Sequence, residues 1–140
     1  MQQKWLSLNS YKRMKKISVS PSKNIVRKVH IIDAANVPLG RLATKISILL
    51  MGKHKRTIKN NIDCGDIVEI TNAAQVKMTG RKFEQALFYR HSRYPGSLKT
   101  QTAAEVLKKD PRKLIGGAVY NMLPNNNQRK DRMNRLRFNS

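Results

Sequence analysis

The chain has 140 residues and a formal net charge of +21, because 29 residues are Lys or Arg and only 8 are Asp or Glu. This length suits one domain, and so large a charge excess indicates a polyanionic partner, because the folded chain would otherwise repel itself. The apolar runs are far shorter than the ~20 residues of a membrane-spanning helix. Cys64 is the single cysteine, without a disulfide partner or a zinc-type Cys/His cluster. Composition therefore excludes a membrane-spanning or disulfide-bonded protein and favours a nucleic-acid-binding protein in a reducing compartment.

Residues 1–28 carry eight Lys or Arg, five serines and no acidic residue. This bias is shared by organelle presequences and by RNA-binding tails, and both interpretations stay open. A secretory signal is not expected, because no uninterrupted apolar segment follows the first charges. We expect three parts: a basic N-terminal extension at 1–28, an α/β core domain at 29–124 and a basic C-terminal tail at 125–140.

The first ordered elements are predicted between residues 29 and 52. ValHisIleIleAsp at 29–33 is typical of a short buried strand. In 39–51 the apolar residues recur at three- and four-residue spacing, which predicts a helix with one face on a sheet, and Gly52 supplies its stop. A strand followed closely by a helix indicates a layered α/β arrangement. The cations of LysHisLysArg at 53–56 either suit the end of that helix or contact a ligand.

Two further strands and a polar loop are predicted in the middle of the chain. AspCysGlyAsp at 63–66 is a turn signal, and IleValGluIle at 67–70 resumes the alternation of a strand. Another strand is expected at 75–79. Residues 88–99 contain three aromatic rings, three cations and a Pro-Gly break, which is too polar for a core. This loop is either a solvated connection or a contact with RNA.

The last third of the chain is predicted to be helical. ThrAlaAlaGlu at 102–105 fits a capping box, and Pro111 after Asp110 suits the first position of a second helix. An apolar stripe over 114–122 follows, weakened by two glycines, and Pro124 ends it. Beyond it, a possible helix carries cations on every side and so suits an RNA groove better than a protein core. Its cations are Arg129, Lys130, Arg132, Arg135 and Arg137.

Catalytic or cofactor chemistry is not predicted. The raw material for acid–base catalysis or a metal site consists of His30, His54, His91, Asp63 and Asp66. No pair of them sits at the helical i, i+4 separation, and turn formation already explains the two carboxylates. Gly40 before Arg41 is compatible with close packing or with the approach of a phosphate, but it is weak as a nucleotide motif. We expect no enzyme activity, no metal and no cofactor.

A series of motifs follows in order along the chain. They are AspAlaAlaAsnValProLeuGlyArgLeuAla (33–43), GlyLysHisLys (52–55), AspCysGlyAsp (63–66), ThrGlyArgLys (79–82), TyrArgHisSerArgTyrProGly (89–96) and AlaValTyrAsnMetLeuPro (118–124). Together they resemble the ribosomal protein L13 family over residues 29–138. The resemblance implies a three-layer α/β/α domain with a central four-stranded, mainly parallel sheet. It also implies a structural role in the large ribosomal subunit, binding its rRNA early in assembly. The expected partners are that rRNA and neighbouring large-subunit proteins, with no membrane, no small-molecule substrate and no independent homo-oligomer.

The resemblance also implies where rRNA is bound. The motif positions are Gly52, Lys53, His54, Lys55, Gly80, Arg81, Lys82, Tyr89, Arg90, His91, Tyr94, Pro95, Gly96, Lys99, Met122, Leu123 and Pro124. Beside them we include the nearby cations Arg41, Arg56 and Arg93, and the five C-terminal cations named above. Lys and Arg would pair with phosphates and the glycines would allow close backbone approach, while Tyr94 and His91 would contact ribose or base. His91 could instead hydrogen-bond within its own loop. Because aromatic residues make up only 6% of the chain, phosphate and shape contacts are expected rather than stacking on aromatic platforms.

Details of the sequence bear on the compartment and on other functions. The acid-free N-terminal segment, AspCysGlyAsp, PheGluGln at 83–85 and LysAspPro at 109–111 look more like mitochondrial members than plastid or bacterial ones. A ribosome of the mitochondrial matrix is therefore expected. Arg93 and Ser97 stand where the family often has glycine, so local contacts there can differ. Two other functions stay open: a free RNA-binding regulator or assembly factor, and an RNA-processing enzyme.

Overall fold

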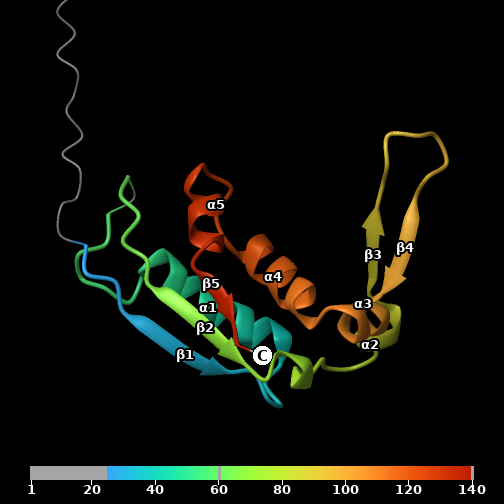
Figure 1. Cartoon of the computed structure of the whole chain (residues 1–140), viewed down its shortest axis with the longest axis horizontal. Helices are drawn as coiled ribbons and strands as arrows, with labels where there is room; N and C mark the ends of the chain where they lie inside the picture. The colour runs from blue at the N-terminus through green and yellow to red at the C-terminus, as the bar shows by residue number, and fades with distance from the viewer. Residues whose placement is uncertain (1–24, 60, 140) are drawn as a thin grey trace, which may run out of the picture.

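The computed structural model of the chain describes residues 25–59 and 61–139 (Figure 1). Most of the expected N-terminal extension lies outside the described residues. Within them, no helix is both long and apolar enough to span a membrane. The elements in chain order are β1 (Val29–Asp33), α1 (Leu39–Met51), β2 (Ile67–Thr71), the 3-10 helix η2 (Ala73–Gln75), α2 (Lys82–Gln85), β3 (Leu87–Arg90), β4 (Lys99–Thr102), α3 (Ala103–Lys109), α4 (Pro111–Met122), α5 (Gln128–Met133) and β5 (Leu136–Phe138).

The main sheet is three-stranded and parallel, in the order β1-β2-β5. The predicted α/β class is therefore confirmed, but the sheet has three strands where four were expected. The segment 75–79, predicted as a strand, keeps only an isolated bridge between Lys77 and Pro38. The physical reason is local: Asn72 adopts the left-handed conformation (φ 54°), and the next residues coil into η2.

The two faces of the sheet differ. Helix α1 lies against one face (Figure 1), but the outward side chains Val29 and Ile31 of β1 are 54% and 70% exposed. The strand at 29–33 is thus an edge strand covered on one side, not a fully buried one. Among the described residues the expected three-layer arrangement is not evident, because the core gathers on the α1 side of the sheet.

The core forms where α1 meets the sheet and α4. The predicted stripe of α1 is confirmed, since Leu42, Ile46 and Leu50 are fully buried. They share one cluster with Val68 and Ile70 of β2 and with residues of α4. Burying each such side chain stabilises the fold by about 1.5–3 kcal/mol. Helix α1 ends at the predicted glycine, which adopts the left-handed conformation as its C-cap.

The segment 88–99 was predicted as a loop. It includes most of β3, the first residue of β4 and the turn between them, and the hairpin that these two strands form stands away from the body (Figure 1). Strands β3 and β4 pair antiparallel, from Leu87 opposite Thr102 to Arg90 opposite Lys99. All four side chains of β3 are exposed. The period-2 alternation that marks a half-buried strand is therefore missing from the sequence.

The predicted helix starts of the last third are confirmed. Thr102 and Glu105 form the capping box of α3, and the Asp110 side chain accepts a hydrogen bond from the Arg112 N–H at the start of α4. The segment 125–140 differs from the expected tail, however. It supplies α5 and β5, and β5 pairs with β2 as an edge of the main sheet. Residues 128–138 therefore pack with the core domain.

Candidate RNA-binding surface

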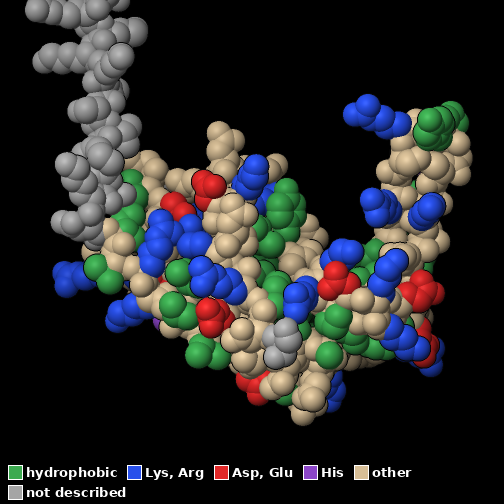
Figure 2. All heavy atoms as spheres, viewed as in Figure 1, with side chains coloured by type: hydrophobic (Ala, Val, Ile, Leu, Met, Phe, Trp, Pro, Cys, Tyr) green, Lys and Arg blue, Asp and Glu red, His purple; other side chains and the backbone are tan. Residues whose placement is uncertain are grey.

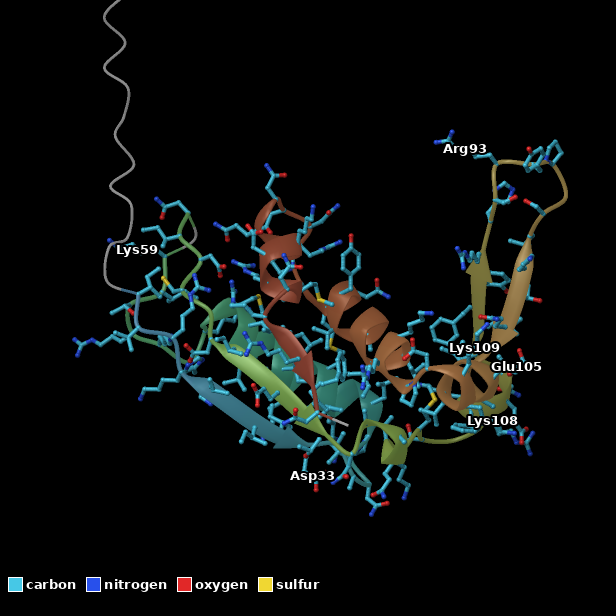
Figure 3. All side chains as sticks on the ribbon, viewed as in Figure 1. Asp33, Lys59, Arg93, Glu105, Lys108 and Lys109 are labelled. Atoms are coloured by element: carbon cyan, nitrogen blue, oxygen red, sulfur yellow. The ribbon has the colours of Figure 1, made fainter. Side chains whose placement is uncertain are left out.

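The hairpin presents the largest group of predicted RNA contacts to solvent. Every one of them is exposed: Tyr89, Arg90, His91, Arg93, Tyr94, Pro95, Gly96 and Lys99. Arg90 and Lys99 lie directly opposite each other on the two strands. Like charges at this position destabilise a hairpin by themselves, so the pair is suited to an anion that bridges it. Arg93 extends from the tip (Figure 3).

The tip of the hairpin is held by hydroxyl groups. The Ser92 hydroxyl donates to the Ser97 hydroxyl at 2.6 Å, and the Ser97 hydroxyl donates to the Tyr94 carbonyl at 2.7 Å. Gly96 has φ +75°, a conformation that favours glycine. Within the described residues, His91 has no hydrogen-bond partner. The alternative, in which His91 hydrogen-bonds within its own loop, is therefore not supported by a hydrogen bond among the described residues.

Two predicted contacts meet at the base of the hairpin. Arg41, in the first turn of α1, and Lys82, at the start of α2, line one surface cavity of about 530 Å³. Gly80 turns the chain into α2 with φ +63°, and Arg81 beside it is exposed. The structure thus brings together two cations that lie far apart in the sequence.

The GlyLysHisLys motif is divided between surface and interior. Lys53 and Arg56 are exposed. In contrast, the Lys55 ammonium donates to the carbonyls of Val26 and Cys64, each at 3.1 Å, and to a carboxylate oxygen of Asp66. Its side chain is only 17% exposed. The charge of Lys55 is therefore already balanced inside the protein.

The requirement for glycine at position 52 of the same motif comes from a close contact within the protein. A Cβ atom there would lie 2.8 Å from the Cys64 carbonyl oxygen. The close backbone approach expected at this glycine is thus made to the 64–65 segment.

Asp66 is the centre of this interior network, and its side chain is fully buried. One oxygen accepts from the Lys28 N–H at 3.0 Å and from Lys55. The other accepts from Nε2 of His30 at 2.9 Å and of His54 at 2.8 Å. Burial by itself would raise the pKa of Asp66, but the hydrogen bonds from Lys55, Lys28 and His30 and the charge of Lys55 hold it well below its usual range.

The same three side chains are the described group best placed for a metal. His30, His54 and Asp66 offer ligand atoms that lie within 4.8 Å of one another, and imidazole with carboxylate is a donor set that zinc uses. Both Asp66 oxygens, however, already accept hydrogen bonds from protein donors. The arrangement is satisfied as a charge network that ties β1 and the 53–56 segment to the start of β2.

Asp63 holds the C-terminal segment in the same way. Arg135 donates to both of its oxygens and also to the Leu50 carbonyl at 3.2 Å. The Arg132 Nε lies 3.7 Å from Asp63, with its side chain only 7% exposed. Two cations predicted to bind RNA are therefore directed into the protein. Sequence reasoning treated Asp63 and Asp66 as turn formers, and nothing local in the sequence indicates partners so distant along the chain.

The MetLeuPro turn after α4 is fixed by Arg129. This side chain donates to the Leu123 carbonyl at 2.8 Å and the Pro124 carbonyl at 3.1 Å, and it lies 4.4 Å from the ring centre of Tyr120. Leu123 is buried in the core, whereas Met122 and Pro124 are exposed. Of this motif, only those two side chains are available to a partner.

The remaining predicted cations lie on the surface. Lys130 is exposed, and Arg137 is exposed with a loose 3.8 Å ion pair to Glu69. Figure 2 shows Lys and Arg side chains over one face of the body and along the hairpin, with fewer acidic side chains among them. The exposed part of the RNA-binding surface predicted from the sequence is thus the hairpin, its base, the exposed part of the GlyLysHisLys–MetLeuPro region, and Lys130 and Arg137.

Comparison with known proteins identifies the family of the chain. The family described as ribosomal protein L13 matches residues 27–139. The chain is 42% identical to the large ribosomal subunit protein uL13 of Thermotoga petrophila over 127 residues, which cover 91% of this chain and 85% of that protein. It is 43% identical to the Staphylococcus carnosus protein of the same name over 111 residues, or 79% of this chain and 77% of the relative. For the Saccharopolyspora erythraea protein the identity is 50% over 97 residues, or 69% and 66%. The match spans the parallel sheet, the hairpin and the Asp63–Asp66 network alike, and by it the chain belongs to the ribosomal protein L13 family.

Proposed function

We propose that this chain is a structural constituent of the large ribosomal subunit that binds large-subunit rRNA and helps to organise it during assembly. The observation that carries the proposal is the exposed hairpin on which Arg90 and Lys99 lie opposite each other, and neither forms an ion pair with an acidic side chain among the described residues. An RNA phosphate between these cations would relieve their repulsion. Membership of the ribosomal protein L13 family and the similarity to large ribosomal subunit proteins support the ribosomal setting.

The mechanism is electrostatic and geometric. The hairpin stands away from the body (Figure 1) and carries Lys and Arg side chains along its length (Figure 2), so it can enter a space between RNA segments while the body rests on their surface. Lys and Arg neutralise phosphates and release counterions, which supplies sequence-independent affinity. The Asp66 network ties the 53–56 segment to the start of β2, so that the exposed Lys53 and Arg56 are held in place before RNA binds.

The proposed role is structural and not enzymatic. The family is one of ribosomal proteins. Of the groups that could have served acid–base chemistry, His30, His54, Asp63 and Asp66 are used in internal hydrogen bonds, and His91 lies apart from them on the exposed hairpin. Neighbouring large-subunit proteins are the expected further partners. We also propose that the ribosome is mitochondrial, because the acid-free N-terminal segment, AspCysGlyAsp at 63–66, PheGluGln at 83–85 and LysAspPro at 109–111 look more like mitochondrial members of the family. The relatives named above are bacterial. Determining the N-terminus of the protein recovered from purified mitochondrial ribosomes tests this placement.

Salt-dependent binding to large-subunit rRNA tests the role of the hairpin. Because each neutralised phosphate contributes about 0.7–0.9 to the slope of log K against log salt, we expect Arg90→Ala with Lys99→Ala to lower the slope by about 0.7–1.8. The matched control is Lys108→Ala with Lys109→Ala, which removes the same charge from α3 (Figure 3). An equal decrease in both double variants would show that only net charge matters.

Sedimentation separates the ribosomal role from a free RNA-binding regulator or assembly factor. A structural constituent stays with the large subunit in stoichiometric amount through a high-salt wash. Release of most of the protein into the soluble fraction would contradict the proposal.

A further inference from the structure

A surface cavity of about 450 Å³ opens where the end of α1, the segment 53–59 and the MetLeuPro turn meet. Its size is within the range of small-ligand pockets. Two of its apolar lining residues, Ile58 and Met122, are 40% and 41% exposed. They come from segments far apart in the sequence, so neither motif alone predicts the cavity.

The polar side chains that line the cavity are three cations and one amide. Lys53, Lys59 and Arg132 line it together with the Asn126 carboxamide. Among the described residues that line it, none is acidic. Lys59 lies toward the opposite end of the molecule from the hairpin tip (Figure 3). The chemistry of the site is thus an apolar wall with cations and one amide that can donate and accept hydrogen bonds.

The guanidinium group of Arg132, which lines the cavity, is buried and only partly hydrogen-bonded. Its side chain is only 7% exposed, one terminal nitrogen donates to the Gln128 side chain at 2.6 Å, and its Nε has no hydrogen-bond partner among the described residues. Buried guanidinium groups are normally satisfied. The Nε lies 3.7 Å from an oxygen of Asp63, so Asp63 balances the charge of Arg132. The excess positive charge of the cavity comes from Lys53 and Lys59, which form no ion pair with an acidic side chain among the described residues.

We propose that this cavity receives one unstacked nucleotide of the bound RNA, with the base against Met122 and Ile58 and a phosphate near Lys53 and Lys59. This inference rests on the proposed function and specifies its ligand. Unstacked bases are the usual target of sequence-selective RNA recognition. The polarizable Met122 thioether makes favourable contacts with aromatic rings, so it can replace the aromatic platform that this chain, with 6% aromatic residues, largely lacks. The cations and the absence of acidic groups among the described lining residues favour an anionic nucleotide over a basic peptide.

The test uses the full chain and two single-stranded probes of equal length and charge. One is an adenosine oligoribonucleotide, and the other is the same backbone without bases. A base contact of about 1 kcal/mol, the lower end for stacked bases, corresponds to about fivefold tighter binding of the first probe. We expect this preference in the parent chain at constant salt.

Matched variants locate the preference. Ile58→Ser should reduce the preference to less than twofold without changing the salt slope, because it removes apolar wall and no charge. The control Ile48→Ser makes the same change at a residue of similar exposure, 38%, outside the cavity, and should keep the preference. Met122→Ser provides a second, independent cavity variant, and circular dichroism verifies that each variant is folded.

Three results would overturn the inference. Equal binding of both probes by the parent chain, with the salt slope intact, would leave the proposed function standing and exclude a base in the cavity; this is the outcome expected if a neighbouring protein fills it. Equal loss of preference in Ile48→Ser and Ile58→Ser would place the base contact elsewhere. Weak, salt-independent binding of both probes would contradict the proposed function itself.

Discussion

Replacing Asp66 with Asn should destabilise the protein severely while leaving its surface unchanged. The carboxylate is fully buried and accepts from the Lys28 N–H, His30, His54 and Lys55. The amide of Asn has nearly the same shape but no charge, so the Lys55 ammonium, only 17% exposed, loses its counter-ion. Breaking a buried ion pair from one side costs about 3–5 kcal/mol. For a domain near this size that loss lowers Tm by on the order of 10–20 °C.

Thermal and urea unfolding measured by circular dichroism test this prediction. The matched control is Asp131→Asn on α5, an exposed aspartate, which should change stability by less than about 0.5 kcal/mol. A loss below about 1 kcal/mol in Asp66→Asn would refute the reasoning, because it would mean that water or rearranged side chains replace the carboxylate at little cost.

The pH dependence gives a second readout of the same carboxylate. The native pKa of Asp66 is lowered, so its contribution to stability is fully present above the unfolded-state pKa of about 3.9 and is lost as pH falls toward the native value. The stability difference between the parent chain and Asp66→Asn should thus be constant near neutral pH and shrink below about pH 4. A difference that stays constant through acid pH would assign it to packing.

The glycines give two further predictions of opposite sign. Gly65→Ala should lower the free energy of unfolding by at least about 3 kcal/mol or prevent folding, because its Cβ would lie 1.8 Å from the Leu50 carbonyl oxygen. The control is Gly40→Ala, where an added Cβ meets nothing within 4 Å. Equal unfolding free energies for the two variants would contradict the packing argument. Gly117→Ala should stabilise α4 by about 0.5–1 kcal/mol, since the added Cβ also meets nothing within 4 Å; an unchanged or lower Tm would show that the backbone at Gly117 needs the freedom of glycine.

The elements that could be predicted from the sequence are those with one face on the core. Helix α1 was predictable to the residue because its stripe and its Gly52 stop are both local signals, and the capping box of α3 is another local signal. The hairpin escaped prediction because its strands contact no core, so no alternation marks them. Strand β5 escaped because it has three residues and depends on pairing with β2, far away in the sequence.

The sequence predicted the exposed cations of the candidate site well. It predicted less well the cations that form ion pairs inside the protein. Exposed cations such as Arg90 and Arg93 are visible from composition and loop position alone. Lys55 and Arg135 look the same in the sequence, and only the fold shows that they pair with Asp66 and Asp63. A basic helix can pack on a protein core when a half-buried carboxylate pairs with its cations, as Asp63 does with the buried Arg132.

The position of β5 in the sheet has a consequence for how the chain folds during its own synthesis. Because chains emerge from the translating ribosome N-terminal end first, β1, α1 and β2 are available long before Leu136–Phe138. Until then one edge of β2 lacks its partner, and Asp63 lacks Arg132 and Arg135. The native sheet therefore closes only when the last strand has left the exit tunnel. Within the α/β body, folding is completed after release of residue 138, whereas the hairpin, whose two strands lie close together in the chain, can form earlier.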